Sequence, residues 1–364
     1  MNQGNSHSPI RVLIVDDSAF MRTALSRMIA CDADLSVAGT AASGSEALQK
    51  IAALNPDVVT LDMQMPGMDG LETLRRIMDQ FPRPVIMVSS VTLKDAEATF
   101  SALGAGAFDY VPKMLSSTSL HIIHIQDDLL RKIKAAAECR ALRDRLNSPR
   151  KAPRPAEVPI RRETRSDVPA LVAIGISTGG PKALQEILPV LPDDLPVPIV
   201  VVQHMPLGFT SPFAARLDTL CAATVREASG GENAKPGVIY IAPAGCHITV
   251  ERTSQSRVKI CLSDKPEKQL HVPSVDVMMQ SVASSFGSLA MGIIMTGMGS
   301  DGALGMSAIH QEGGWTVGQD ELSCAVYGMP RVCAEMGILD RVVALGQIPH
   351  EIMHATRYRK MNVG

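Results

Sequence analysis

Residues 10–30 read IRVLIVDDSAFMRTALSRMIA, a short run rich in apolar and β-branched side chains followed at once by a longer run that favours a helix. The first part predicts a buried β-strand over residues 10–15. Ser18 is placed to accept a hydrogen bond at the start of a helix over residues 19–30. This strand–turn–helix unit is the repeating element of an α/β fold.

The same unit recurs up to about residue 130. Ser43 and Glu46 form a capping-box pattern that opens a second helix, which we expect to end at Leu54. Strict alternation of strands and helices with short connections predicts a parallel sheet covered on both faces. The further strands are predicted at residues 35–41, 58–61, 85–89 and 108–111, and the last helix from about residue 122.

Composition excludes several classes of protein. The 364 residues are about twice the length of a typical single domain, so we expect two domains. Hydrophobic residues make up 46% of the chain, which is ample for buried cores and excludes wholesale disorder. A net charge of -2 and an aromatic content of 3% argue against a general nucleic-acid coat.

The cysteines and the apolar runs favour a cytoplasmic protein. The seven cysteines are odd in number and contain no CxxC pair, which disfavours a disulfide framework or a zinc ribbon. The opening residues, MNQGNSHSPIR, lack the apolar core of a signal peptide. No apolar run approaches the roughly 20 residues needed to span a bilayer. We therefore expect a reducing, cytoplasmic environment.

Residues 140–169 read RALRDRLNSPRKAPRPAEVPIRRETRSDVP and separate two halves. Five prolines, many arginines and little apolar periodicity predict a linker, with a basic docking surface as the alternative. Residues 247–251 and 257–262 alternate like a hairpin. Buried strands of a second, larger α/β domain are predicted at residues 171–176, 199–203, 238–242 and 292–295.

Carboxylates gather at the predicted carboxyl ends of strands in the first half. Asp16 and Asp17 follow the first strand, and Asp62 ends the third. Three carboxylates in one small volume repel one another, and a hard divalent cation relieves that repulsion. Lys113 and Ser89 add an ammonium and a hydroxyl at other strand ends, a set suited to holding a phosphoryl group. Taken singly, Asp16 is also interpretable as a helix cap and Asp62 as a turn residue.

Four segments together resemble the response-regulator receiver family, over roughly residues 8–130. They are VDDS at residues 15–18, LDMQMPGMDG at 61–70, MVSS at 87–90 and DYVPK at 109–113. The resemblance implies a flavodoxin-like fold with a five-stranded parallel sheet. It also implies a histidine kinase as phosphodonor, and together with the methylesterase resemblance described below it implies a chemotaxis histidine kinase.

The receiver resemblance also assigns roles to individual residues. It implies Asp62 as phosphoacceptor and a Mg²⁺ site formed by Asp17, Asp62, the supporting Asp16 and the backbone carbonyl of Gln64. It further implies Ser89 and Tyr110 as switch residues and Lys113 as the phosphate-sensing lysine. The family usually has proline after that lysine, and here Met114 stands in its place.

A candidate nucleophile lies at the start of the second half. Residues 175–181 read GISTGGP between a predicted strand and a helix-competent run, which is G-x-S-x-G in the strand–turn–helix context of a nucleophile elbow. Glycines on both sides allow a tight turn, and the amides at the following helix start suit an oxyanion. A glycine-rich turn that cradles phosphate is the alternative interpretation.

A serine nucleophile needs a base, and the base needs an orienting acid. His204 ends the predicted strand at residues 199–203, on the sheet edge expected for Ser177, and Asp301 follows a later strand. We expect His247, at the start of its strand, on the opposite edge, and His271 in a polar loop. Asp301 is also interpretable as a simple helix cap. The chain order Ser, His, Asp differs from that of α/β-hydrolases.

Four further segments resemble the catalytic domain of the chemotaxis receptor methylesterase family, CheB. They are IGISTGGP at residues 174–181, QHMP at 203–206, IAPAGCH at 241–247 and TGMGSDGA at 296–303. The resemblance implies Ser177 as nucleophile, His204 as general acid/base and Asp301 as its orienter. It places Thr178 and Met298 beside the site, where their amides are candidates to hold an oxyanion; for Met298, a core or loop role is the alternative.

The two resemblances together predict an organisation and a function. We expect a receiver over residues 8–130, a helix extension and linker over 131–167, and a methylesterase domain, doubly wound α/β, over 168–350. Such a protein hydrolyses glutamate γ-methyl esters, and deamidates glutamines, on methyl-accepting chemotaxis receptors without a catalytic metal. We expect the unphosphorylated receiver to cover the Ser177 cleft. The alternatives are a DNA-binding response regulator and a scaffold that has lost activity.

Overall fold

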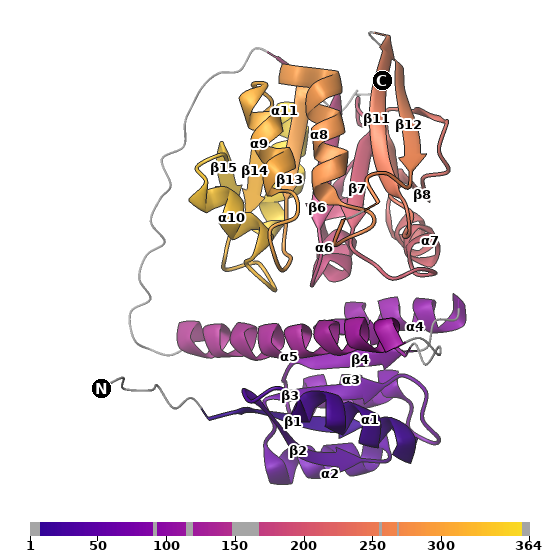
Figure 1. Cartoon of the computed structure of the whole chain (residues 1–364), viewed down its shortest axis with the longest axis vertical. Coiled ribbons are helices and arrows are strands. Elements are labelled where there is room, and N and C mark those ends of the chain that lie inside the picture. The colour runs from indigo at the N-terminus through magenta and orange to yellow at the C-terminus, as the bar shows by residue number, and fades with distance from the viewer. Residues whose placement is uncertain are drawn as a thin grey trace, which may run out of the picture. The chain divides into compact units, whose positions relative to one another are not determined.

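The chain forms two compact units, Met1–Pro153 and Arg154–Gly364, each with its own sheet (Figure 1). The structure is a computed structural model, and it describes residues 8–89, 93–113, 119–147, 167–254, 257–267 and 269–358. Ser90 and Met114 lie outside these residues, as does most of the predicted linker.

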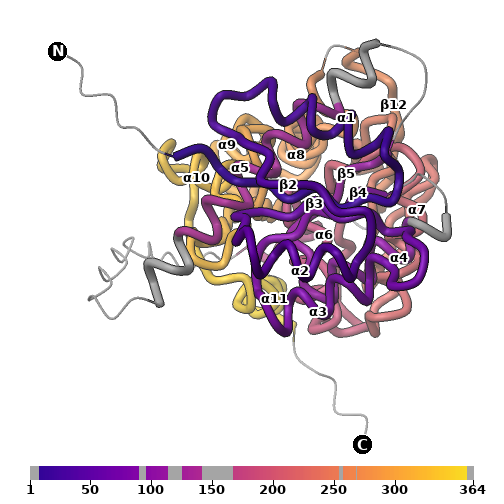
Figure 2. Tube along the Cα trace, turned by 90° about the horizontal axis from the view of Figure 1, so that it is seen from below, coloured from indigo at the N-terminus to yellow at the C-terminus, as the bar shows by residue number. Residues whose placement is uncertain are grey.

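The first unit is a five-stranded parallel sheet in the order β2-β1-β3-β4-β5. All five residues of β3 and of β4 are buried, which requires cover on both faces of the sheet. Helices α1 and α5 pack together on one side, and α3 packs against α2 and α4 on the other (Figure 2). The strands are β1 (Ile10–Val15), β2 (Leu35–Ala41), β3 (Val58–Asp62), β4 (Val85–Ser89) and β5 (Asp109–Pro112). The helices are α1 (Ala19–Ala30), α2 (Gly44–Leu54), α3 (Gly70–Gln80), α4 (Leu93–Gly104) and α5 (Ser119–Asn147).

Local capping explains where the early helices begin. The Ser18 hydroxyl accepts a hydrogen bond from the Met21 amide and starts α1. The Ser43 hydroxyl accepts from the Glu46 amide, while the Glu46 carboxylate accepts from the Ala42 amide, so the predicted capping box closes one residue further out than usual. Helix α5 runs on to Asn147, eight residues into the segment predicted as a linker.

The second unit contains a seven-stranded parallel sheet in the order β15-β14-β13-β6-β7-β10-β8. Chain order reverses beside β6, since β7, β10 and β8 lie to one side and β13, β14 and β15 to the other. Such a reversal opens a crevice at the carboxyl ends of the strands. The strands are β6 (Leu171–Ile176), β7 (Ile199–Gln203), β8 (Thr224–Glu227), β10 (Val238–Ile241), β13 (Ala290–Ile294), β14 (Trp315–Gln319) and β15 (Arg341–Val343).

The predicted hairpin forms a sheet of its own. Strand β11 (His247–Ser254) pairs antiparallel with β12 (Arg257–Ser263), and β12 also pairs with the short β9 (Asn233–Ala234). Helix α8 contacts β11 on one side and α9 on the other, and it also contacts β6 (Figure 1). The helices of this unit are α6 (Gly180–Ile187), α7 (Thr210–Leu220), α8 (Val275–Phe286), α9 (Ala303–Gln311), α10 (Met329–Glu335) and α11 (Ile348–Ala355), with short 3₁₀ turns at Leu188–Val190, Gly287–Leu289 and Leu345–Gln347.

The core of the second unit holds α8 in place. Val275, Met278 and Met279 of α8 have no exposed surface, and they pack in one buried cluster with residues of β6 and β13. Val275 also lies where a side chain on Gly175 would be, because a Cβ there would come within 2.2 Å of it. Glycine at residue 175 therefore lets the start of α8 approach the end of β6 closely.

Candidate functional site

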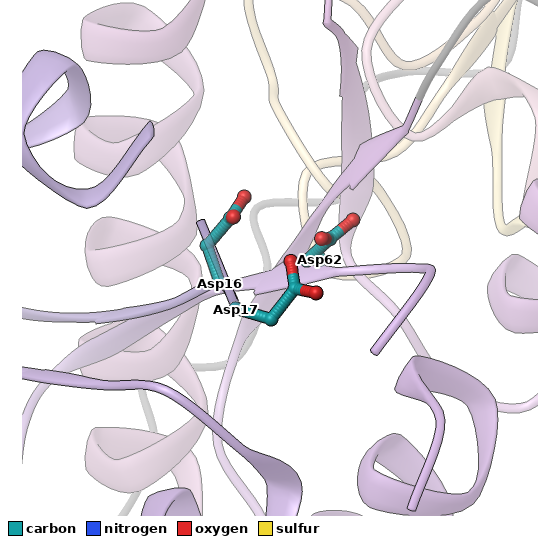
Figure 3. A group of neighbouring side chains, drawn as sticks. All are labelled: Asp16, Asp17 and Asp62. Carbon is teal, nitrogen blue, oxygen red and sulfur yellow. The ribbon is translucent and has the colours of Figure 1, made fainter. Parts of the chain in front are cut away.

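Three carboxylates meet at the carboxyl edge of the receiver sheet (Figure 3). Asp16 and Asp17 follow β1, and Asp62 ends the neighbouring strand β3, with which β1 pairs in parallel. One oxygen from each side chain lies within 4.8 Å of the others; Asp16 and Asp62 are buried, and Asp17 is exposed. The set consists of oxygen ligands only, which fits a hard divalent cation.

One lysine partly compensates this charge. The Lys113 ammonium lies 2.8 Å from Asp16 Oδ2 and 2.7 Å from Asp62 Oδ2. Burial lowers the pKa of Lys113, but the hydrogen bonds and charges of the two carboxylates outweigh it and hold that pKa above its usual value. Burial, together with the Asp16 charge, raises the pKa of Asp62 despite Lys113. The cluster therefore lacks positive charge, and a divalent cation would supply it.

The predicted switch residues are buried on β4 and β5. The Ser89 hydroxyl, with no exposed surface, accepts a hydrogen bond of 2.9 Å from the Thr99 hydroxyl. The Tyr110 ring is 3% exposed and meets Phe100 edge to face, with ring centroids 6.4 Å apart. Burial raises the pKa of Tyr110 well above its usual value. The backbone amide of Gln64 donates a hydrogen bond to Asp62 Oδ1 at 3.2 Å. The role of the Gln64 backbone carbonyl as a metal ligand remains a prediction.

Ser177 and His204 follow neighbouring parallel strands, β6 and β7, and so lie at the same edge of the second sheet. Two backbone hydrogen bonds hold Ser177 and His204 in these positions. The Ser177 amide donates to the Thr296 carbonyl, just after β13, at 3.0 Å, and the His204 amide donates to the Ile176 carbonyl at 3.2 Å. Asp301 reaches the same place from the loop after β13.

The three side chains form one hydrogen-bonded line. His204 Nδ1 lies 3.1 Å from Ser177 Oγ, and His204 Nε2 lies 2.8 Å from Asp301 Oδ2. In the familiar serine-protease triad, Nε2 faces the serine and Nδ1 faces the aspartate, so the ring is used the other way round here. If Ser177 is the nucleophile, Nδ1 is the nitrogen that would accept its proton, and the neutral ring would then carry its own proton on Nε2.

The Asp301 carboxylate has four hydrogen-bond partners, which is more than a role as the cap of the next helix would need. Its Oδ1 accepts from the Ser274 hydroxyl at 2.8 Å and from the Asp276 amide at 3.0 Å, and its Oδ2 accepts from the Val275 amide at 2.8 Å in addition to His204. Burial would raise the pKa of Asp301, but the hydrogen bonds and the charge of His204, with the two amides, lower it well below its usual value. Asp301 is thus ionised, and its carboxylate holds the first amides of α8 rather than those of α9, the helix that follows it.

A second carboxylate completes an exchange of caps between the two helices. Asp276, in the first turn of α8, accepts with Oδ1 from the Gly302 amide at 2.9 Å and from the Gly305 amide at 2.8 Å. The start of α9 is therefore held by Asp276 of α8, and the start of α8 is held by Asp301, which lies in the turn just before α9. Burial raises the pKa of Asp276, with a further contribution from the Asp301 charge. This exchange locks the position of Asp301 to the packing of α8 on α9.

Gln203 was not among the residues predicted for the site, although it belongs to the quoted segment QHMP. Its side chain is 1% exposed, and its Nε2 donates to the carbonyls of Ser177 at 3.0 Å and His204 at 2.9 Å. One side-chain amide group therefore ties the backbone of Ser177 to that of His204. The feature of the sequence that could have pointed to Gln203 is its position directly before His204.

The expected position of His247 was wrong. That expectation treated its strand as part of the parallel sheet, whereas β11 belongs to the separate antiparallel sheet. His247 has no exposed surface, and its Nδ1 accepts from the Ser274 amide at 3.1 Å. Since the Ser274 hydroxyl binds Asp301, His247 lies directly behind the aspartate of the line.

Glycines make the turn at Ser177 possible. Gly179 has φ of 75°, in the left-handed region, and a Cβ there would come within 2.4 Å of Ala325. A Cβ on Gly297 would come within 2.8 Å of Ser177 Cβ. The segment after β13 thus touches the serine directly.

Thr178 and Met298 flank this contact as predicted neighbours of the site. Thr178 is 7% exposed, and its carbonyl accepts from the Thr296 hydroxyl at 2.9 Å. Met298 follows Gly297 and is partly exposed. Among the described residues, neither amide donates a hydrogen bond within the protein, so both are available as oxyanion donors.

Among the described helices, none combines the length and the apolar character that crossing a membrane demands.

Comparison with known families divides the chain in the same order. Residues 172–352 match the CheB methylesterase family model, and residues 12–124 match the response regulator receiver domain model. In the solved structures, the catalytic domain of Thermotoga maritima CheB methylesterase matches with 39% sequence identity and a TM-score of 0.49, covering 51% of this chain and 98% of that chain.

Full-length relatives match both halves at once. A protein-glutamate methylesterase/protein-glutamine glutaminase 2 of Nitratidesulfovibrio vulgaris is 46% identical, covering 95% of this chain and 99% of the relative. A protein-glutamate methylesterase/protein-glutamine glutaminase 1 of Oleidesulfovibrio alaskensis is 45% identical over the same shares of the two chains. The chain therefore belongs to the CheB methylesterase family, in the form that carries a response regulator receiver domain ahead of the methylesterase domain.

Proposed function

We propose that this protein is a phosphorylation-activated serine hydrolase that removes methyl groups from glutamate γ-methyl esters of chemotaxis receptors. The observation that carries the proposal is the hydrogen-bonded line from Ser177 Oγ through His204 to Asp301. Relatives that match nearly the whole chain are named for this activity. Their names also include glutamine deamidation, which the same chemistry accommodates.

The first half of the reaction forms an acyl-enzyme. Ser177 Oγ attacks the ester carbonyl while its proton moves to His204 Nδ1, and the Asp301 carboxylate stabilises the resulting imidazolium through Nε2. The amides of Thr178 and Met298 stabilise the oxyanion. The tetrahedral intermediate then breaks its bond to the methoxy oxygen, which takes the proton from Nδ1 and leaves as methanol.

The second half releases the product. A water molecule attacks the acyl carbonyl and gives its proton to His204 Nδ1. Collapse of the second tetrahedral intermediate returns that proton to Ser177 Oγ and leaves a glutamate side chain. A glutamine side chain follows the same route, with ammonia as the first leaving group. Each proton that His204 accepts is given back within the same half-reaction.

The receiver supplies the control. Asp62 is the proposed phosphoacceptor, and Asp16, Asp17 and the Gln64 carbonyl complete the proposed Mg²⁺ site with it. When bound, the cation would neutralise charge on the transferring phosphoryl group. Lys113 already contacts Asp62 and would hold the phosphoryl oxygens, while the Ser89 hydroxyl and the Tyr110 ring would report the change to the rest of the receiver.

The partners follow from this assignment. A chemotaxis histidine kinase is the proposed phosphodonor, and methylated chemoreceptors are the proposed substrate. Both place the protein in the cytoplasm.

The test measures methanol release from membranes that contain methylated chemoreceptors. We expect release by the wild-type protein, a higher rate with Mg²⁺ and a small-molecule phosphodonor, and no release above background by Ser177→Ala. Release by Ser177→Ala at the wild-type rate would overturn the assignment of the nucleophile. A wild-type protein that released no methanol under either condition would overturn the proposed function.

A further inference from the structure

The His204 ring has a neighbour that none of its hydrogen bonds involves. The ring of His271 lies against it, with centroids 4.1 Å apart and planes inclined by 15°. This is a stacked arrangement, so His271 covers one face of the His204 ring. The hydrogen bonds to Ser177 and Asp301 leave at the edge of that ring, through its two nitrogens.

The loop that carries His271 is anchored on both sides of it. This loop joins β12 to α8, and residues 264–267 and 269–273 of it are described. At its start the Pro266 carbonyl accepts a hydrogen bond from His247 Nε2 at 3.2 Å. At its end the Ser274 amide donates to His247 Nδ1 at 3.1 Å. One buried imidazole therefore binds both ends of the loop.

A third anchor lies next to the stacked ring. The Val272 carbonyl accepts from the Gly245 amide at 3.2 Å, so the residue after His271 is tied to the turn between β10 and β11. Because His247 has no exposed surface, the contacts that hold the loop ends are sheltered from water. Such anchoring fixes the path of the loop without help from regular secondary structure.

The same loop reaches Asp301. Ser274, which ends the loop and caps α8, donates its hydroxyl hydrogen to Asp301 Oδ1 at 2.8 Å. One short segment thus contacts two members of the line, the aspartate at its end and the face of the imidazole in its middle. The side chains of His204 and Asp301 are only 9% and 12% exposed.

We propose that His271 is a positioning residue for the hydrolysis reaction. Hydrogen bonds at the ring edge resist tilting of the His204 plane only weakly, whereas a stacked ring at van der Waals distance blocks it. His271 thereby keeps Nδ1 directed at Ser177 and Nε2 directed at Asp301 through repeated proton transfers. The inference rests on the proposed function, since it concerns the base of that reaction.

The test compares three substitutions in the full-length protein. His271→Ala removes the stacked ring, His271→Leu fills much of the volume without a planar face, and His271→Phe restores a planar ring without ring nitrogens. We expect kcat to fall about 10- to 100-fold in the first two variants, the size of effect that small misplacements of catalytic groups produce. KM should stay within about threefold of wild type, because a positioning residue affects the chemical step rather than substrate binding.

Rescue by His271→Phe separates positioning from other roles. We expect this variant to recover kcat to within about threefold of wild type, since stacking needs only a planar ring. Wild-type kcat in both His271→Ala and His271→Leu would overturn the inference, as would a His271→Phe variant as slow as His271→Leu. If His271→Ala does not fold, the comparison of Leu with Phe still decides.

Two controls distinguish failure of this inference from failure of the proposed function. Ser177→Ala, measured in parallel, reports whether methanol release depends on the serine at all. His350→Ala replaces an exposed histidine on α11 and should leave kcat and KM unchanged. The rate at which a fluorophosphonate labels Ser177 gives a second measurement that needs no receptor, and it should fall in His271→Ala and recover in His271→Phe.

Discussion

The substitution Asp301→Asn should inactivate the enzyme by changing a tautomer rather than by removing a contact. An asparagine oxygen at the Oδ1 position keeps the hydrogen bonds from the Ser274 hydroxyl and the Asp276 amide. Its NH₂ group then replaces Oδ2, which accepts from the Val275 amide and His204 Nε2 in the native protein. In this orientation the asparagine NH₂ group faces two other donors, the Val275 amide and His204 Nε2.

His204 can relieve that conflict only by losing its proton from Nε2. The neutral ring then carries the proton on Nδ1, the nitrogen 3.1 Å from Ser177 Oγ, and cannot accept the serine proton. The same exchange in other Ser–His–Asp triads lowers kcat about 10⁴-fold, which corresponds to about 5.4 kcal/mol at 1.36 kcal/mol for each factor of ten. We expect a loss of similar size in methanol release at saturating substrate, with little change in KM.

Stability adds a second, independent readout. The unpaired Val275 amide should cost about 1–3 kcal/mol in the free energy of unfolding, measured by urea denaturation. Because the pKa of Asp301 is lowered in the folded protein, its ionisation contributes stability above the ordinary pKa of about 3.9. That contribution is lost as the pH falls toward the lowered pKa, and Asp301→Asn should lack this part of the acid dependence.

Asp276→Asn is the matched control. Its asparagine oxygen keeps both hydrogen bonds from the Gly302 and Gly305 amides, and it leaves the tautomer of His204 unaffected. We expect kcat to fall less than tenfold. If Asp301→Asn lowered kcat no further than this control does, the reasoning on the tautomer would be refuted.

Four other predictions concern the receiver and the turn at Ser177. Asp62→Asn should abolish stimulation by a phosphodonor, and a variant that is still stimulated would contradict the phosphoacceptor assignment. The same variant should raise the receiver's urea midpoint at pH 7, because burial raises the pKa of Asp62 and so disfavours its ionised form. Mg²⁺ should raise the wild-type receiver's melting temperature more than that of Asp62→Asn. Lys132→Met should destabilise the receiver by about 1.5–3 kcal/mol in denaturant titrations, because it removes the hydrogen bond of 2.6 Å that the ammonium donates to the Tyr110 carbonyl and its ion pair of 3.0 Å with Asp128; unchanged stability would show that neither contact contributes. Gly297→Ala should lower kcat about 100-fold, because the new Cβ would lie 2.8 Å from Ser177 Cβ, and wild-type kcat would show that the backbone yields there.

Much of the fold was predictable because both sheets are parallel and buried. Their strands appear in the sequence as apolar runs, and five of the predicted strand ranges, including residues 10–15 and 171–176, agree with the structure residue for residue. The predicted α/β fold class is confirmed, as is the hairpin. Strands β8, β9, β14 and β15 were not predicted, and β15 has only three residues, each partly exposed.

The line of Ser177, His204 and Asp301 could be proposed from sequence because each residue follows a strand whose end is predictable. The supporting residues could not. The positions of Ser274 and His271 depend on a loop without periodic pattern. His247 was expected at the opposite edge of the parallel sheet, but its strand, β11, belongs to the separate antiparallel sheet. The exchange of caps between Asp276 and Asp301 needs two helices to meet, which no local pattern shows.

The central claim is that the Ser177 hydroxyl, activated by His204, forms the acyl bond to receptor glutamate. The most direct measurement is methanol release from methylated receptor membranes by Ser177→Ala, at matched protein concentration and folded state. The account predicts a turnover roughly 10³–10⁶ lower than that of the wild-type protein, with the same melting temperature within about 2 °C. Turnover within tenfold of wild type in a folded Ser177→Ala protein would contradict it.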